Sequence, residues 1–159
     1  MKRIVLTTVQ GIIIFVGLAT FLFLLAEPHL EGRNAEATLF EIYFNDVFLA
    51  CVYAASTLFF IALYKAYRLV GFMKQNQLHS QNSLRALRTI RYCMVTLITL
   101  LIVAEAYLFV VLRTKDDIAG GVVMGLFMML VFTSISIFTT LFERHLQKGF
   151  SLSSSNDQL

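Results

Sequence analysis

The sequence predicts an all-α integral membrane protein, a bundle of four transmembrane helices with both the N- and C-termini in the cytoplasm. Three observations lead to this prediction. Of the 159 residues, 58% are apolar and only 14% are charged, whereas about a quarter are charged in soluble domains. Four apolar stretches each exceed the roughly 20 residues that a helix needs to cross a bilayer. Basic residues gather on one side of these stretches. The length of the chain predicts one transmembrane domain over residues 1–159.

The first apolar stretch, residues 4–26, follows Lys2 and Arg3, and a charged start is also typical of a secretory signal peptide. Its apolar core is longer than the roughly 7–15 residues of such a peptide, and no clean small-residue cleavage site precedes Glu27. We therefore expect it to be retained as a span. The remaining segments are predicted as spans at 47–72, 90–112 and 118–142, a cytoplasmic loop at 73–89 and a cytoplasmic tail at 143–159.

The distribution of Lys and Arg predicts the orientation of these spans. Arg33, Arg113 and Lys115 lie in the two segments expected outside the membrane. The other ten basic residues lie at the opposite ends of the spans: Lys2, Arg3, Lys65, Arg68, Lys74, Arg85, Arg88, Arg91, Arg144 and Lys148. Positively charged loops stay in the cytoplasm, so both termini and the middle loop are predicted to be cytoplasmic.

Glu105 is the acidic residue expected inside a span. It lies seven residues before Leu112, about 10 Å from the outer end of the third span. A carboxylate at this depth is costly, and such acids often mark proton or ion pathways. Two interpretations stay open. The carboxyl is either protonated and hydrogen-bonded to a hydroxyl group of another helix, or central to transport or sensing.

Gly121 and Gly125 form a small-xxx-small pair in the fourth span, which lets two helix backbones approach closely. The pair favours packing within the chain, with a homo-oligomer as the alternative. Asp116 or Asp117 is expected to cap the N-terminus of the same helix, where an acidic side chain also complements the helix dipole.

The segment before the third span is expected to begin a helix capped by Ser80 or Ser83. Arg85, Arg88 and Arg91 recur every three residues and therefore share one face of this helix. Two roles stay open for them, contact with anionic lipid headgroups or docking of a cytoplasmic partner. Direct binding of nucleic acid is not expected, because no recognition-helix module fits in so short a segment.

The pattern of Cys and His residues gives no support for a catalytic or metal site. Cys51 and Cys93 lie far apart in apolar stretches, and His29, His79 and His145 lie in separate segments. No HExxH, GxSxG or phosphate-binding glycine loop is present. We therefore expect no cofactor, no metal ion and no enzymatic activity.

Residues 59–93, FFIALYKAYRLVGFMKQNQLHSQNSLRALRTIRYC, resemble the bacterial membrane proteins grouped as domain of unknown function 2975. The family's motif at the start of its third span is matched at Ser83, Leu87, Arg88, Ile90, Arg91 and Tyr92. Its acidic turn before the last helix is similar to residues 116–121, and its closing motif to residues 149–157, with Ser155 where Glu is common. The resemblance covers about residues 55–159.

This resemblance implies a four-span, multi-pass protein of the bacterial cytoplasmic (inner) membrane with no assigned activity, and it supplies no catalytic or ligand residue. Members are often encoded beside a small helix-turn-helix regulator, which implies such a regulator as a cytoplasmic partner. Because the distinctive residues cluster at 74–92 and 149–157, we expect a non-enzymatic regulator or sensor that acts through its cytoplasmic loop and tail. The alternative is a small transporter, or an immunity-type membrane protein, that uses Glu105.

Overall fold

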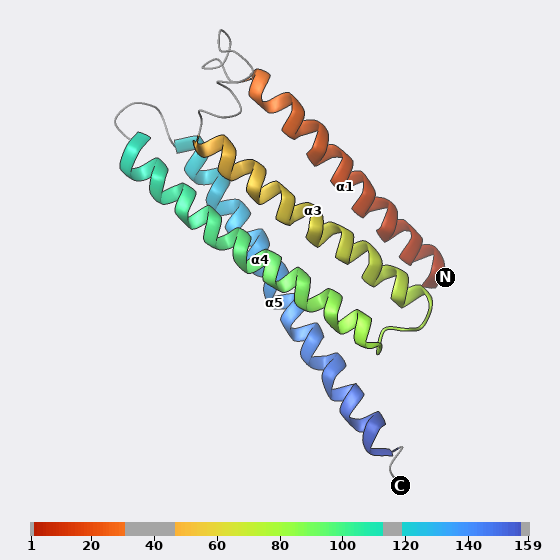
Figure 1. The fold of residues 1–159 in the computed structure, drawn as a ribbon. Coiled ribbons are helices and arrows are strands. Elements are labelled where there is room, and N and C mark those ends of the chain that lie inside the picture. The colour runs from red at the N-terminus through yellow and green to blue at the C-terminus, as the bar shows by residue number, and fades with distance from the viewer. Residues whose placement is uncertain (1, 31–46, 113–118, 157–159) are drawn as a thin grey trace.

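The computed structural model describes residues 2–30, 47–112 and 119–156. The described residues form four helices joined, where the connection is described, by a short turn (Figure 1). The helices are α1 (Lys2–Leu30), α3 (Val47–Lys74), α4 (Gln81–Tyr107) and α5 (Ala119–Asn156), and a π-helical segment (Leu108–Leu112) continues α4. There is no strand in these ranges. The predicted all-α class is confirmed.

Three of the four helices are long and apolar enough to cross a membrane. Their apolar parts are Arg3–Ala26, Gln81–Val110 and Gly120–Gly149, which correspond to the first, third and fourth predicted spans. The second predicted span coincides with α3, which is 28 residues or about 42 Å long but carries Lys65 and Arg68 in its second half. A fourth span therefore stays a prediction.

The turn between α3 and α4 is short because a serine cap starts α4 early. Ser80 has extended backbone angles and its side chain accepts a hydrogen bond from the Ser83 N–H at 3.3 Å, as the sequence predicts for one of these two serines. The Ser83 hydroxyl is fully buried and donates to the Gln77 carbonyl at 3.0 Å. Asn76 reverses the chain with a φ of 55°, a left-handed conformation that Asn tolerates. Residues 81–89 are consequently helical.

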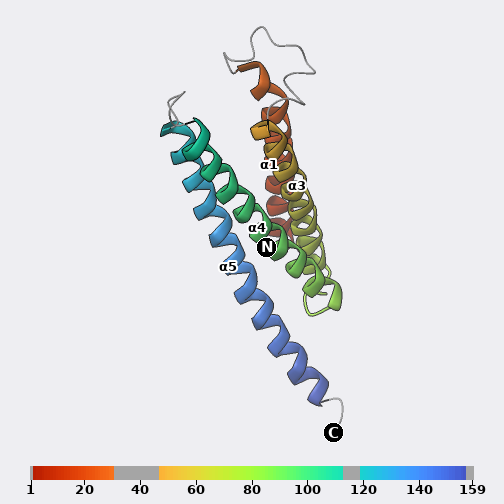
Figure 2. The same cartoon turned by 60° about the vertical axis from the view of Figure 1, so that its left-hand side comes forward.

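The core of the molecule is centred on α4, which packs against α3 on one side and α5 on the other, while α1 packs against α3 (Figures 1 and 2). The start of α1, the α3–α4 turn and the end of α5 lie at one end of the molecule (Figure 1). We call this the basic end, because the ten cations set apart by the sequence belong to the segments that meet there. The buried core residues are Ala62, Ile90, Cys93, Met94, Leu97 and Phe132.

α1 lies at the edge of the helix layer, where most of its surface has no protein partner. Its apolar side chains are exposed, with Phe15 at 71%, and no residue of its apolar part, Arg3–Ala26, is buried. Gln10 makes polar contacts with α3: its amide nitrogen donates to the Tyr67 carbonyl at 3.3 Å, and its amide oxygen accepts from Lys74 Nζ. Near the other end, the Tyr53 hydroxyl of α3 donates to the Leu24 carbonyl of α1 at 3.5 Å. An apolar edge of this kind is stable in lipid and not in water.

α5 is longer than a membrane span. It has 38 residues and is about 57 Å long, against a hydrocarbon core of about 30 Å. Residues 143–156, predicted as a tail, continue the helix. A Cβ atom on Gly149 would lie 3.3 Å from Cδ2 of His79, so α5 passes beside the α3–α4 turn before it ends.

Candidate functional site

Glu143 of α5 lies between two arginines of α4 at the basic end. Its carboxylate is buried, with a side-chain exposure of 5%. Arg88 Nε donates to Oε1 at 2.8 Å, and Arg91 Nη1 lies 2.9 Å from Oε2 as an ion pair whose geometry does not form a hydrogen bond. Gln147 Nε2 donates to Oε1 at 3.1 Å. We call these four residues the ionic clamp, because they join α4 to α5 through a buried charge.

Helix periodicity accounts for the ionic clamp. Residues three or four apart share a face of a helix, which aligns Arg88 with Arg91 on α4 and Glu143 with Gln147 on α5. Glu143 directly follows the last residue of the predicted apolar span, Phe142. A buried carboxylate is costly unless it is paired with a cation. Here both arginines pair with it while remaining partly exposed themselves, with side-chain exposures of 51% for Arg88 and 29% for Arg91.

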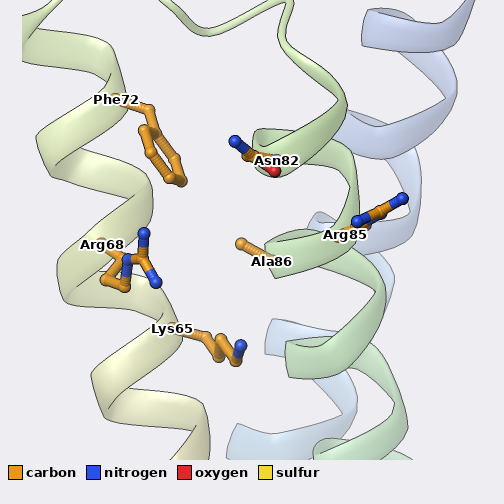
Figure 3. A pocket seen from close by; sticks show the side chains of 6 residues that line it. All are labelled: Lys65, Arg68, Phe72, Asn82, Arg85 and Ala86. Atoms are coloured by element: carbon orange, nitrogen blue, oxygen red, sulfur yellow. The ribbon is translucent and has the colours of Figure 1, made fainter.

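The three arginines predicted to share one face have different surroundings in the structure. Arg88 and Arg91 contact Glu143. Arg85, one turn nearer the start of α4, lines a cavity between α3 and α4 together with Lys65 and Arg68 of α3 (Figure 3). Docking of a partner or of lipid on these arginines stays a prediction, and two of them already have a partner within the chain.

Glu105 lies at the opposite end of the α4–α5 interface and packs against Gly125. A Cβ atom at position 125 would overlap the carboxylate of Glu105 and come within 2.7 Å of its Cδ. Only glycine leaves room for the acid in this position. Oε2 of Glu105 is buried and has no hydrogen-bond partner among the described residues, so the hydroxyl partner expected from the sequence is not found there for this oxygen.

The chain leaves regular α-helical geometry at Leu108, three residues after Glu105. The Leu108 N–H is shared between the carbonyls of Ala104 and Glu105, and residues 108–112 form a π-helix. Single π-helical turns are frequent at functional sites. Gly121 faces the same segment, because a Cβ there would lie 3.6 Å from Leu108 Cδ1. Both glycines of the predicted pair therefore lie beside α4 or its π-helical continuation within the same chain.

Several predicted features fall outside this interface. Asp116 and Asp117 lie outside the described residues, so the capping prediction is not tested. Cys51 and Cys93 are free thiols. In the described ranges, no three His, Cys, Asp or Glu residues come close enough together to hold a metal ion. The expectation of no cofactor stays a prediction.

Sequence reasoning singled out Arg88 and Arg91 but not their partner. The pattern of cations alone does not identify this partner, Glu143. A signal was present, since an acid placed directly at the end of an apolar span must find a counter-charge from a neighbouring helix. The same pattern does not predict that Lys65 and Arg68 line a cavity.

The fold, the apolar edge and the three long apolar helices define the class of helical membrane proteins. Within this class, the chain belongs to the family described as protein of unknown function (DUF2975), whose model matches residues 33–158. The resemblance expected for residues 55–159 is thereby confirmed, and the match begins earlier. The chain is also similar to the "Uncharacterized membrane protein YoaS" of Bacillus subtilis (strain 168), with 29% identity over 140 residues, 88% of this chain and 86% of that protein. No solved structure matches.

Proposed function

We propose that the protein is a non-enzymatic regulator or sensor of the bacterial cytoplasmic membrane that acts on a soluble partner through its basic end. The ionic clamp is the observation that carries this proposal. It ties α4 to α5 at the level where the apolar part of α5 ends, with Glu143 as the joining charge. The predicted orientation places this end in the cytoplasm.

The continuity of α5 supports a regulatory role. The same helix contacts Glu105 at Gly125, holds the clamp at Glu143 and continues to Asn156. Small shifts of one helix along another are a common form of switching, and a shift of α5 against α4 would change both contacts. We call residues 150–156 the C-terminal arm. The family match reaches residue 158 and so includes this arm. The helix-turn-helix regulator implied by the family resemblance is the partner we propose.

Removal of the arm tests the proposal directly. A chain that ends at Gly149 keeps every contact described for α5 and lacks only residues 150–159. We expect this truncated chain to reach the membrane at the wild-type level and to give the transcript profile of the gene deletion. Crosslinked capture of the soluble partner should fall at least tenfold. The measurements are RNA sequencing and quantitative mass spectrometry of the captured protein.

A point variant provides the finer test of the docking face. Arg85→Glu reverses a charge at the basic end without touching the clamp, and we expect it to reduce partner capture several-fold. Gly120→Ala is the matched control, because a Cβ at position 120 meets only open space. The proposal is wrong if the gene deletion leaves the transcript profile unchanged, or if the truncated chain behaves as the wild type does.

A second candidate function rests on Glu105. Its buried, unpartnered Oε2 supports a small transporter or an immunity-type protein, in which a carboxyl inside the membrane binds a proton or a cation. Glu105→Gln should then abolish transport or resistance, whereas Glu105→Asp should keep part of it. The cavity between α3 and α4 favours the first proposal, because Glu105 does not line it. The cavity lies beside Arg85, which is twenty residues, or about 30 Å, along α4 from Glu105.

A further inference from the structure

A cavity of about 160 Å³ lies between the second half of α3 and the first two turns of α4. Figure 3 shows Lys65 and Arg68 extending from α3 toward α4 and Asn82 directed from α4 toward α3, whereas the guanidinium of Arg85 is directed away from α3. Three of the lining residues are cations and none is an acid. The full lining consists of Lys65, Arg68, Phe72, Asn82, Arg85 and Ala86.

The three cations of this cavity have no counter-charge in the described part of the chain. Arg88 and Arg91 share the one buried acid nearby, Glu143, whereas Lys65, Arg68 and Arg85 form no ion pair there. Arg68 instead lies over the ring of Phe72, with Cζ 5.4 Å from the ring centroid. Lys65 and Arg68 extend toward the same cavity and repel each other, so an anion bound between them is stabilised by both.

The chemistry of the lining favours a phosphate group. Arginine presents its guanidinium N–H groups as a fork that matches phosphate oxygens, and lysine adds a point charge. The Asn82 amide can donate a further hydrogen bond. Asn82, Arg85 and Ala86 belong to the first two turns of α4, where the helix dipole also favours negative charge.

The volume of the cavity and its position along α3 narrow the choice of ligand further. The cavity is smaller than the roughly 300–1,000 Å³ pockets of drug-sized ligands, so a phosphate fits and a nucleotide does not. Residues 47–64 of α3 carry no charge and are about 27 Å long, close to the thickness of the hydrocarbon core. Lys65 follows this run, so the predicted second span would place it at the level of the lipid headgroups.

We propose that this cavity binds a phosphate group, held by Lys65 and Arg68 with the amide of Asn82. Phosphate of this kind is available from an anionic lipid headgroup at the membrane surface or from the free anion in the cytoplasm. The site does not depend on the regulatory role proposed above, because it requires only the α3–α4 pair.

The test uses the purified full chain in uncharged detergent. Native mass spectrometry measures binding of phosphatidylglycerol, with phosphatidylcholine as the neutral reference lipid. We expect Lys65→Gln and Arg68→Gln each to weaken phosphatidylglycerol binding about fivefold per lost charge, and the double variant to weaken it more than tenfold. The conservative pair Lys65→Arg and Arg68→Lys should retain most of the affinity. Size-exclusion profiles and circular dichroism check that each variant folds.

Arg144→Gln is the matched control, because Arg144 is an exposed cation of α5 near the same end and does not line the cavity. Its loss should change binding less than twofold. Added inorganic phosphate identifies the source: displacement of the lipid indicates that the free anion also binds, and no displacement indicates a site for the lipid-attached group. The proposal is overturned if the double variant binds as tightly as the wild type, or if Arg144→Gln weakens binding as much.

Discussion

The α4–α5 interface contains two carboxyl groups, Glu143 buried and Glu105 partly buried, and it accommodates them in opposite ways. Glu143 of α5 is held by two arginines and a glutamine at the basic end. Glu105 of α4 lies at the other end against Gly125, and its Oε2 has no partner among the described residues. Gly125 and Glu143 are eighteen residues apart on α5, which is about 27 Å.

The difference shows how two acids with the same side chain can do different things in one interface. At the basic end the surroundings provide charge, so the ionised carboxylate joins the two helices. At the other end the surroundings provide space, because the missing side chain of Gly125 makes room for the acid. The first site is sensitive to loss of its partners, and the second to any gain in volume opposite it.

The largest effect is expected when the ionic clamp loses its cations. Arg88→Ala combined with Arg91→Ala leaves Glu143 buried without a counter-charge, which should lower the free energy of unfolding by about 3 kcal/mol. Unfolding in mixed detergent–SDS micelles, followed by circular dichroism, measures this change. Glu143→Gln should cost less, because the partly exposed arginines can be hydrated. An equal or greater loss for Glu143→Gln would show that the buried charge is not the determining factor.

A smaller effect is expected when volume is added opposite Glu105. Gly125→Ala forces the carboxyl out of its position and should destabilise the protein by about 1–2 kcal/mol. Gly121→Ala is the matched control and should cost about 0.5 kcal/mol or less, because its Cβ would make an ordinary contact at 3.6 Å. Combining Gly125→Ala with Glu105→Ala should recover much of the loss, and additive effects in this double-mutant cycle would contradict the proposed contact.

The smallest effect on stability is expected for Glu105→Gln, which keeps the shape of the side chain and removes its acidity. If the site mainly provides space, the free energy of unfolding should change by less than about 0.5 kcal/mol. The same unfolding assay measures it, with Glu105→Leu as a comparison of different shape. A large loss for Glu105→Gln alone would indicate a charge-dependent partner that the described residues do not include.

The helices could largely be predicted from the sequence, because each depends on a local pattern. The apolar stretches located the three long helices, and Ser80 predicted the start of α4. The contacts between helices could not be predicted in the same way. Glu105 and Gly125 were each singled out, but their contact depends on the register between α4 and α5. The periodicity of Arg85, Arg88 and Arg91 predicts a shared face of α4. The register between α4 and α5 decides that Glu143 pairs with Arg88 and Arg91 and not with Arg85.

The unbroken course of α5 has a mechanical consequence. Helices bend sharply only at identifiable defects such as proline or a π-bulge, and α5 is a single α-helix from Ala119 to Asn156 without a proline. Asn156 lies thirteen residues, or about 20 Å, beyond Glu143. With the clamp as a fulcrum, a tilt of about 10° within the bilayer would carry Asn156 sideways by roughly 3 Å. The helix would then act as a rigid lever that converts a small rearrangement among the spans into a displacement at its far end.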